Sequence, residues 1–245
     1  MPCAVRALHS LCIVVSDQTA KEVLPVRVKW LGHSCFLLTS DSGTRILTDP
    51  YTPGQGGLNY GPINEPADIV LASHEHYDHN NVAAVKGKPQ VIKGPGSREA
   101  KGIKFTGIPA YHDEDKGTKR GNDTIFVFEL DGMRICHLGD LGHDLSDAEV
   151  KAIGKVDILF IPVGGFYTFE PQVATRVSDK LKPRVVVPMH FKTPKVDTAT
   201  FGGITGPEEF LKGKSGVSRP NTSEVQFSAG KLGPSTQYVV LTPAA

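Results

Sequence analysis

The sequence predicts an α/β protein in which two β-sheets pack face to face and helices cover their outer sides. Two observations favour this architecture. Short apolar β runs separated by turns dominate from Val26 onward, and helical patterns occur only between the later runs. The order is β-rich, then β and α in alternation, then β again, without a repeat or a linker. We therefore expect one domain over residues 26–245, preceded by a poorly ordered extension over residues 1–25.

We expect the first strands to form a meander. Val26–Trp30, Cys35–Thr39 and Arg45–Thr48 are β-type runs, and Asp41-Ser42-Gly43 supplies a turn between the last two. Ile69–Ala72 is continuously apolar, which is typical of a strand buried on both faces. The further strands that we expect are Val91–Ile92, Ile103–Phe105, Ile108–Tyr111, Thr124–Leu130, Met133–Leu138, Ile158–Val163, Val185–Pro188, Glu224–Phe227 and Gln237–Leu241.

Three segments predict helices between the later strands. Ser146–Ile153 begins at a residue that caps helices well, and Gly154 ends it. Pro171–Leu181 has proline in its first turn and an apolar face at helical spacing. Pro207–Leu211 is a shorter candidate.

Composition and charge exclude several classes of protein. The 245 residues are 39% apolar, and 27 Lys and Arg balance 26 Asp and Glu. A net charge of +1 gives no field that would attract polyanions, so we expect no nucleic-acid partner. No apolar run approaches the roughly 18 residues of a spanning helix, so we expect no membrane partner. The sequence leaves open whether the chain forms a homo-oligomer.

Cysteine usage and the first residues bear on the compartment. Ala7–Val15 imitates the apolar part of a signal peptide, but His9 and Ser10 interrupt it and no A-x-A site follows. We expect a cytoplasmic protein, with export as the alternative. The cysteines form no CxxC pair, so we expect them to be free thiols without a redox or metal role, in a reducing compartment. They stand at Cys3, Cys12, Cys35 and Cys136.

A dense cluster of metal-ligating side chains follows the buried strand 69–72. Three imidazoles and two carboxylates fall within the six residues 74–79. At strand spacing His74 and His76 lie on the same face and can coordinate one metal ion. If the chain then turns, Asp78 and His79 can reach a second ion nearby. The cluster therefore predicts a metal site.

Other candidate ligands occupy the same kind of position. His112, Asp140 and His190 each stand just beyond the carboxyl end of an apolar run, as the cluster does. Neighbouring parallel strands bring their carboxyl ends to the same edge of a sheet, and ligand sites in layered α/β folds lie at this edge. We expect these side chains to converge there.

With these residues the chain resembles the metallo-β-lactamase superfamily of metal-dependent hydrolases. The resemblance rests on His74-x-His76-x-Asp78-His79, a later His, then Gly-Asp and Pro-Met-His, and it runs from about Val26 to His190. It is closest to an uncharacterised branch of zinc-dependent hydrolases that includes L-ascorbate-6-phosphate lactonase-like proteins. The stretches that resemble this branch are Trp30–Ser34, His137–His143, Ile161–Gly165 and Pro188–Thr193.

The resemblance implies a four-layer αββα sandwich with a dinuclear metal site. Asp49 would support the metal loop by hydrogen bonds. Asp140 stands where many true β-lactamases have Cys, which argues against antibiotic hydrolysis. The implied roles are a first metal on His74, His76 and His112, a second on Asp78, His79 and His190, and Asp140 bridging them.

Five imidazoles and two carboxylates suit Zn²⁺, and Mn²⁺ or Fe²⁺ also fits. We expect a hydroxide held between the metals, oriented by Asp78, to attack a small ester-like substrate: a lactone, a phosphodiester or an acyl metabolite. Two alternatives are a di-iron redox or oxygen-handling protein on this fold and a non-catalytic metal-binding module. The first usually carries an added flavodoxin-like domain, and the second usually has four closed ligands.

The remaining candidates lie near the predicted rim. His33 either contacts substrate or acts as an acid, or else is a hydrogen-bonded histidine of the sheet. His143 is a candidate catalytic residue that could contact substrate, whereas His137 fits a structural role better. Residues 116–120 are expected to form a mobile loop beside the site. Candidate substrate-binding residues are Phe166, Tyr167 and Lys192.

Overall fold

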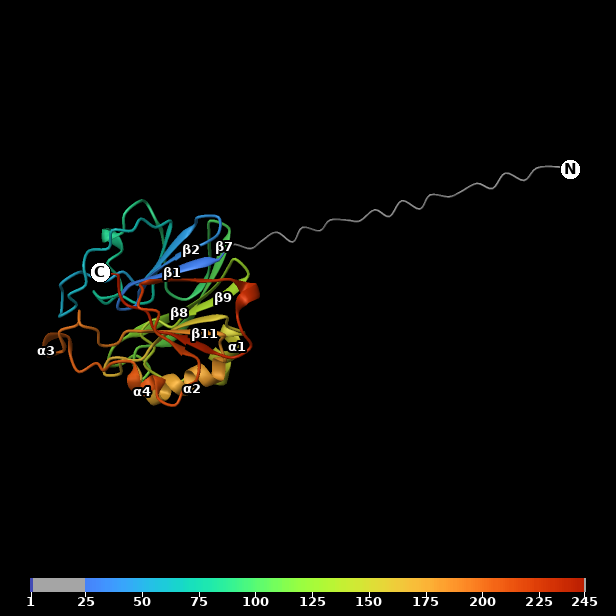
Figure 1. Cartoon of the computed structure of the whole chain (residues 1–245). Coiled ribbons are helices and arrows are strands. Elements are labelled where there is room, and N and C mark those ends of the chain that lie inside the picture. Colours follow the sequence, from blue (N-terminus) through green and yellow to red (C-terminus); the bar gives the residue numbers. More distant parts are fainter. Residues whose placement is uncertain (2–24, 245) are drawn as a thin grey trace.

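The computed structural model describes Met1 and residues 25–244 of the chain (Figure 1). The extension expected over residues 1–25, with Cys3 and Cys12, therefore falls almost wholly outside the described residues. Two β-sheets pack against each other and hold the main apolar core between them. The predicted α/β sandwich is confirmed.

The first sheet has six strands in the order β13-β1-β2-β3-β4-β5. β1, β2, β3 and β13 pair antiparallel, whereas β3, β4 and β5 run parallel. The parallel strands bring the ends of β3 and β4 to one rim. The strands are β1 (Val26–Gly32), β2 (Cys35–Thr39), β3 (Arg45–Thr48), β4 (Ile69–Ala72), β5 (Gln90–Lys93) and β13 (Glu224–Phe227).

The second sheet has eight strands in the order β12-β14-β11-β10-β9-β8-β7-β6. Strands β9, β10, β11, β14 and β12 are parallel, and β6 to β9 form an antiparallel meander. The strands are β6 (Gly96–Ala100), β7 (Ile103–Tyr111), β8 (Asn122–Leu130), β9 (Met133–His137), β10 (Ile158–Pro162), β11 (Val185–Met189), β12 (Val217–Ser218) and β14 (Gln237–Val239).

The outer layers of the sandwich differ. Figure 1 shows α1 (Asp147–Ile153), α2 (Pro171–Leu181) and α4 (Glu208–Leu211) on one side, against the sheet that holds β8 and β11. Irregular chain covers the outer face of the six-stranded sheet and forms a second apolar cluster there, in which Tyr51 and Tyr60 are buried. The short elements are η1 (Val82–Ala84), α3 (Thr198–Phe201) and η2 (Ala229–Lys231).

Local chemistry explains the helix ends. Ser146 caps α1 through a reciprocal pair of hydrogen bonds with Glu149, and Gly154 ends the helix with φ of 71°. α2 begins at Pro171 as predicted. The longest described helix has 11 residues, and none that the structure describes is long and apolar enough to cross a membrane.

Three β features differ from the expectation, and the first is the two-residue strand β12 (Val217–Ser218), which was not predicted because both residues are exposed and no apolar run marks them. Ile103–Phe105 and Ile108–Tyr111 belong to one strand, β7, because β6 and β8 pair with it on both sides. β6 was not predicted, because its residues Gly96–Ala100 are polar and exposed except for the last one. A strand at the edge of a sheet needs no apolar outer face.

Gly142 is expected to be essential for packing beside the rim. A Cβ at this position would lie 2.3 Å from the His112 carbonyl carbon and 2.4 Å from the Asp113 nitrogen, and neither backbone can yield freely. Gly142→Ala should lower the free energy of unfolding by about 1–3 kcal/mol. Urea denaturation measures this. Gly230→Ala is the control, since a Cβ there meets nothing within 4 Å. Equal stability of the two variants would contradict the packing argument.

Candidate metal centre

The predicted ligands meet at one rim of the sandwich, as the strand-end argument requires. His74 to His79 follow β4, His112 follows β7, and His190 follows β11. Asp140 lies three residues beyond the end of β9. Of the seven predicted ligands, all except His76 are buried.

Asp140 lies at the centre of this arrangement. Its Oδ2 is 3.1 Å from Nε2 of His79, 3.2 Å from Nε2 of His190 and 3.3 Å from Nε2 of His112. Nε2 of His74 is 3.9 Å away. One carboxylate oxygen cannot accept hydrogen bonds from four imidazoles at once. Four nitrogens that converge on one oxygen form the donor set of a metal site instead.

The donor atoms fall into three overlapping groups in which all members lie within 4.8 Å of one another. Nε2 of His79, Nε2 of His190 and Oδ1 of Asp140 are buried and lack a hydrogen-bond partner. Buried polar atoms are rarely left in this state. The residues therefore fit divalent ions. The groups are His74–His76–His112, His74–His79–Asp140 and His33–Asp78–His79–His190.

Electrostatics favour the metal-binding forms of both carboxylates and of His76, whereas Asp140 and nearby carboxylates outweigh burial and raise the pKa of His79 and His112, whose extra protons an ion would displace. Burial alone would raise the pKa of Asp140, but His190 and His79 outweigh it and hold the pKa well below its usual range. Asp78 has a lowered pKa because His79 and His33 likewise outweigh its burial. Partial desolvation and the imidazoles of His74 and His112 lower the pKa of His76. Charged carboxylates and a neutral imidazole are the forms that bind cations.

Asp49 supports this loop from behind. Its carboxylate accepts hydrogen bonds from the Ser73 backbone N–H at 2.7 Å and the Ser73 hydroxyl at 2.8 Å. Nδ1 of His79 lies 3.0 Å from Oδ2 of Asp49, and Nε2 of His137 lies 2.8 Å from the same oxygen. The bond to Nδ1 leaves Nε2 of His79 free to face Asp140. His137 thus has a supporting role that sequence reasoning left unspecified.

Asp123 is a further supporting residue that sequence reasoning missed. It is buried near the start of β8, with Oδ1 3.5 Å from Nδ1 of His74. The Ser73 hydroxyl lies 3.0 Å from the same nitrogen. These contacts turn Nε2 of His74 toward the other ligands. The sequence feature that could have indicated Asp123 is its position as a charged residue at the start of the apolar run of β8.

Comparisons with known proteins agree with this geometry. A family model described as a β-lactamase superfamily domain matches residues 27–190. A UPF0173 metal-dependent hydrolase from Thermococcus onnurineus is 32% identical over 214 residues, covering 76% of this chain and 91% of that protein. A relative of the same name from Pyrococcus abyssi is 31% identical over 215 residues, with 76% and 91% covered.

Solved structures agree as well. A structure from Thermotoga maritima, described as a candidate zinc-dependent hydrolase of the metallo-β-lactamase superfamily, matches with a TM-score of 0.71 and 34% identity. The match covers 88% of this chain and 98% of that one. The chain belongs to the metallo-β-lactamase superfamily.

A cleft of about 470 Å³ opens onto this metallo-β-lactamase site. His76, Asp78, His112 and Asp140 line its floor. Its walls supply aromatic surface and two cationic side chains, so a ligand there meets both kinds of group. The wall residues are Glu75, Tyr77, Lys119, Arg120, Tyr167 and Phe201. Among the predicted substrate contacts, only Tyr167 lines this cleft.

The other candidate residues lie elsewhere. Phe166 is 49% exposed and lines an adjacent hollow, and Lys192 is exposed and lines none of the hollows described. His143 accepts a hydrogen bond from the Tyr111 backbone N–H at 3.2 Å and donates one to the Asp144 carbonyl at 2.9 Å. Both ring nitrogens thus serve the backbone, and we leave His143 out of the proposed chemistry below.

His33 lies inside the site. It is fully buried, and its Nε2 is 3.2 Å from Oδ2 of Asp78. Burial is the main cause that lowers the pKa of His33 to about 4, and the neighbouring His190 adds to it. The ring is therefore neutral at neutral pH and offers a lone pair.

The loop over residues 116–120 lies beside the site, as expected. The Asp113 carboxylate accepts backbone hydrogen bonds from four of its neighbours, at 2.7–3.0 Å. These four hydrogen bonds gather the loop around one carboxylate, which argues against the mobility expected from the sequence, and Lys119 and Arg120 line the cleft. The donors are Asp115, Gly117, Lys119 and Arg120.

Asp49→Asn should weaken metal binding although Asp49 is not in the proposed ligand set. The amide lacks the charge that His79 and His137 face, so the orientation of His79 is lost. We expect affinity for Zn²⁺ to fall about 10–100-fold, measured by competition with a chromophoric chelator.

Asp157→Asn is the matched control. Its buried carboxylate also accepts a backbone hydrogen bond, from Arg134 at 2.9 Å, but it lies among none of the donor groups. This variant should lose stability and keep its affinity for Zn²⁺. A folded Asp49→Asn protein with unchanged affinity would refute the supporting role.

Proposed function

We propose that this metal-dependent hydrolase works with two divalent ions and cleaves a small ester-like molecule: a lactone, a phosphodiester or an acylated metabolite. The observation that carries the proposal is the convergence of four imidazole nitrogens on one oxygen of Asp140, at the floor of an open cleft. Zn²⁺ is the ion that we favour, since nitrogen and carboxylate donors suit it.

The ligands divide into two groups around Asp140. Two divalent ions bound there would supply an acidified water and would polarise a carbonyl or phosphoryl oxygen. His74, His76 and His112 would hold one ion. The second ion would lie on Asp78, His79 and His190, with Asp140 between the two.

The chain's own groups then position the reactants. Asp78 is charged and lies at the cleft floor, where its second role is to orient the attacking water. His33 fixes Oδ2 of that carboxylate. Tyr167 and Phe201 give the substrate an apolar wall, and their rings pack edge to face with centroids 5.2 Å apart. Positioning of the reactants and electrostatic stabilisation would therefore supply most of the rate enhancement.

The openness of the site favours catalysis over a purely structural metal. Structural zinc sites usually have four closed protein ligands, whereas here four donor residues line the cleft. The di-iron alternative has no specific observation in its favour. A cytoplasmic location is part of the proposal, supported by the free buried thiols of Cys35 and Cys136.

A hydrolysis panel on Zn²⁺-loaded protein tests the function. The panel holds an aryl phosphodiester, a sugar lactone, a thioester and a chromogenic β-lactam. We expect turnover of one of the first three classes, and little of the β-lactam. Asp78→Ala should lower kcat/KM at least about 100-fold, since loss of a ligand exceeds the cost of losing a supporting partner.

Asp144→Ala is the control for this panel. Its carboxylate pairs with Arg176 and Lys180 outside the cleft, so kcat/KM should stay within about twofold. Metal content of each variant is measured alongside. Protein that holds two ions and turns over none of the four classes would contradict the proposal.

A further inference from the structure

We propose that His33 is an additional protein ligand of the second metal, so that this ion is closed off by the protein while the first ion stays open to substrate. The inference rests on the two-metal function proposed above. It concerns a histidine outside the seven-residue set that the family resemblance implies.

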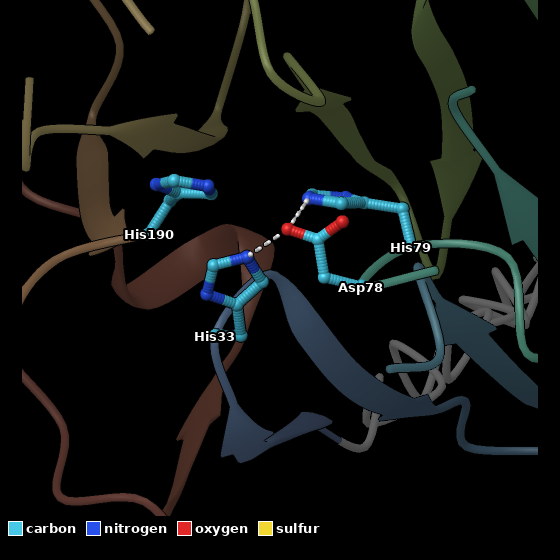
Figure 2. Close-up of side chains that lie close together, drawn as sticks. All are labelled: His33, Asp78, His79 and His190. Atoms are coloured by element: carbon cyan, nitrogen blue, oxygen red, sulfur yellow. Dashed lines mark hydrogen bonds and ion pairs between the residues drawn. The ribbon is translucent and has the colours of Figure 1, made fainter. Parts of the chain in front are cut away.

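The first argument is the geometry of four side chains. One donor atom each of His33, Asp78, His79 and His190 lie within 4.8 Å of one another, which suits a common ion. Figure 2 shows the rings of His33, His79 and His190 around the Asp78 carboxylate. The His33 and His190 ring centroids are 4.1 Å apart, and those of His33 and His79 are 5.1 Å apart.

The second argument is that the backbone is bent to place these rings. His33 and His190 both have left-handed backbone, with φ of 52° and 49°. Residues other than glycine rarely adopt this backbone conformation, and the exceptions concentrate at functional sites. The His190 backbone N–H donates to the His33 carbonyl at 3.3 Å. The indole N–H of Trp30 donates to the same carbonyl at 3.0 Å. The two turns are thus tied together.

The third argument is the state of the ring nitrogens. His33 and His190 are fully buried, so bulk solvent does not reach their ring nitrogens. Nδ1 of His33 and both nitrogens of His190 lack a hydrogen-bond partner. Among the described residues, Asp78 is the one side chain that hydrogen-bonds to His33. An ion between these rings would give Nε2 of His190, which faces Asp140, a partner; it would bind only one nitrogen of each ring.

The consequence is a difference between the two ions. His33, His79 and His190 are absent from the lining of the cleft, whereas His76 and His112 line it. An ion held by three buried imidazoles and Asp78, beside Asp140, has little room for a substrate atom. The ion on the other three histidines keeps an open position. Closed sites are typical of retained metals and open ones of catalytic metals.

Cadmium NMR tests this assignment without an activity measurement. Full-length protein labelled with ¹⁵N-histidine is loaded with two equivalents of ¹¹³Cd²⁺, and scalar coupling counts the imidazoles bound to each ion. We expect three coupled imidazoles on each cadmium. His33→Gln keeps an N–H that can reach Asp78 but lacks the imidazole. In this variant one cadmium should show two coupled imidazoles and bind at least about tenfold more weakly.

His143→Gln is the matched control, because it removes a histidine whose nitrogens serve the backbone. Both cadmium signals should persist unchanged. Wild-type protein in which only His79 and His190 couple to the second cadmium would overturn the His33 assignment and leave the two-metal function standing. A single cadmium bound by His74, His76 and His112 would overturn both. A single cadmium on the His33 group would support His33 and overturn the two-metal function.

Discussion

The buried carboxylate of Asp49 joins the two sheets at the place where the proposed metal ligands meet. Asp49 follows β3 of the six-stranded sheet, and His137, which bonds to it, ends β9 of the other sheet. Ser73 and His79 supply its remaining partners. A buried charge without partners costs several kcal/mol, so these contacts are required together. The loop after β4 takes its shape from this one group.

Much of the fold and of the site could be predicted because both depend on local pattern. β2, β3 and β4 have the bounds expected from the sequence, since strands buried between layers leave few polar positions inside them. A polar cluster just beyond such a run has to lie at a rim. This reasoning placed His74 and His190 at one rim, where both face Oδ2 of Asp140, although more than a hundred residues separate them.

The rest depends on contacts that local pattern does not encode. Asp49 and His137 are 88 residues apart, and nothing in either segment indicates the other. Asp123 on β8 contacts His74, which follows β4 of the other sheet. The roles of His33 and His143 differ for a similar reason: each follows a glycine, and only the packing of the turn decides where the ring points. One ring enters the site, and the other bonds to backbone.

Backbone strain at the rim explains why so many contacts outside the proposed ligand set are needed. His33, Asp49 and His190 all have φ between 38° and 52°, which costs of order 1 kcal/mol for each residue. Such turns persist only where the surroundings determine them. Trp30 holds the turn of His33, and the donors around Asp49 hold the next one. The positions of the donor atoms are therefore set by the packed sandwich, and metal affinity should depend on residues that never touch the ion.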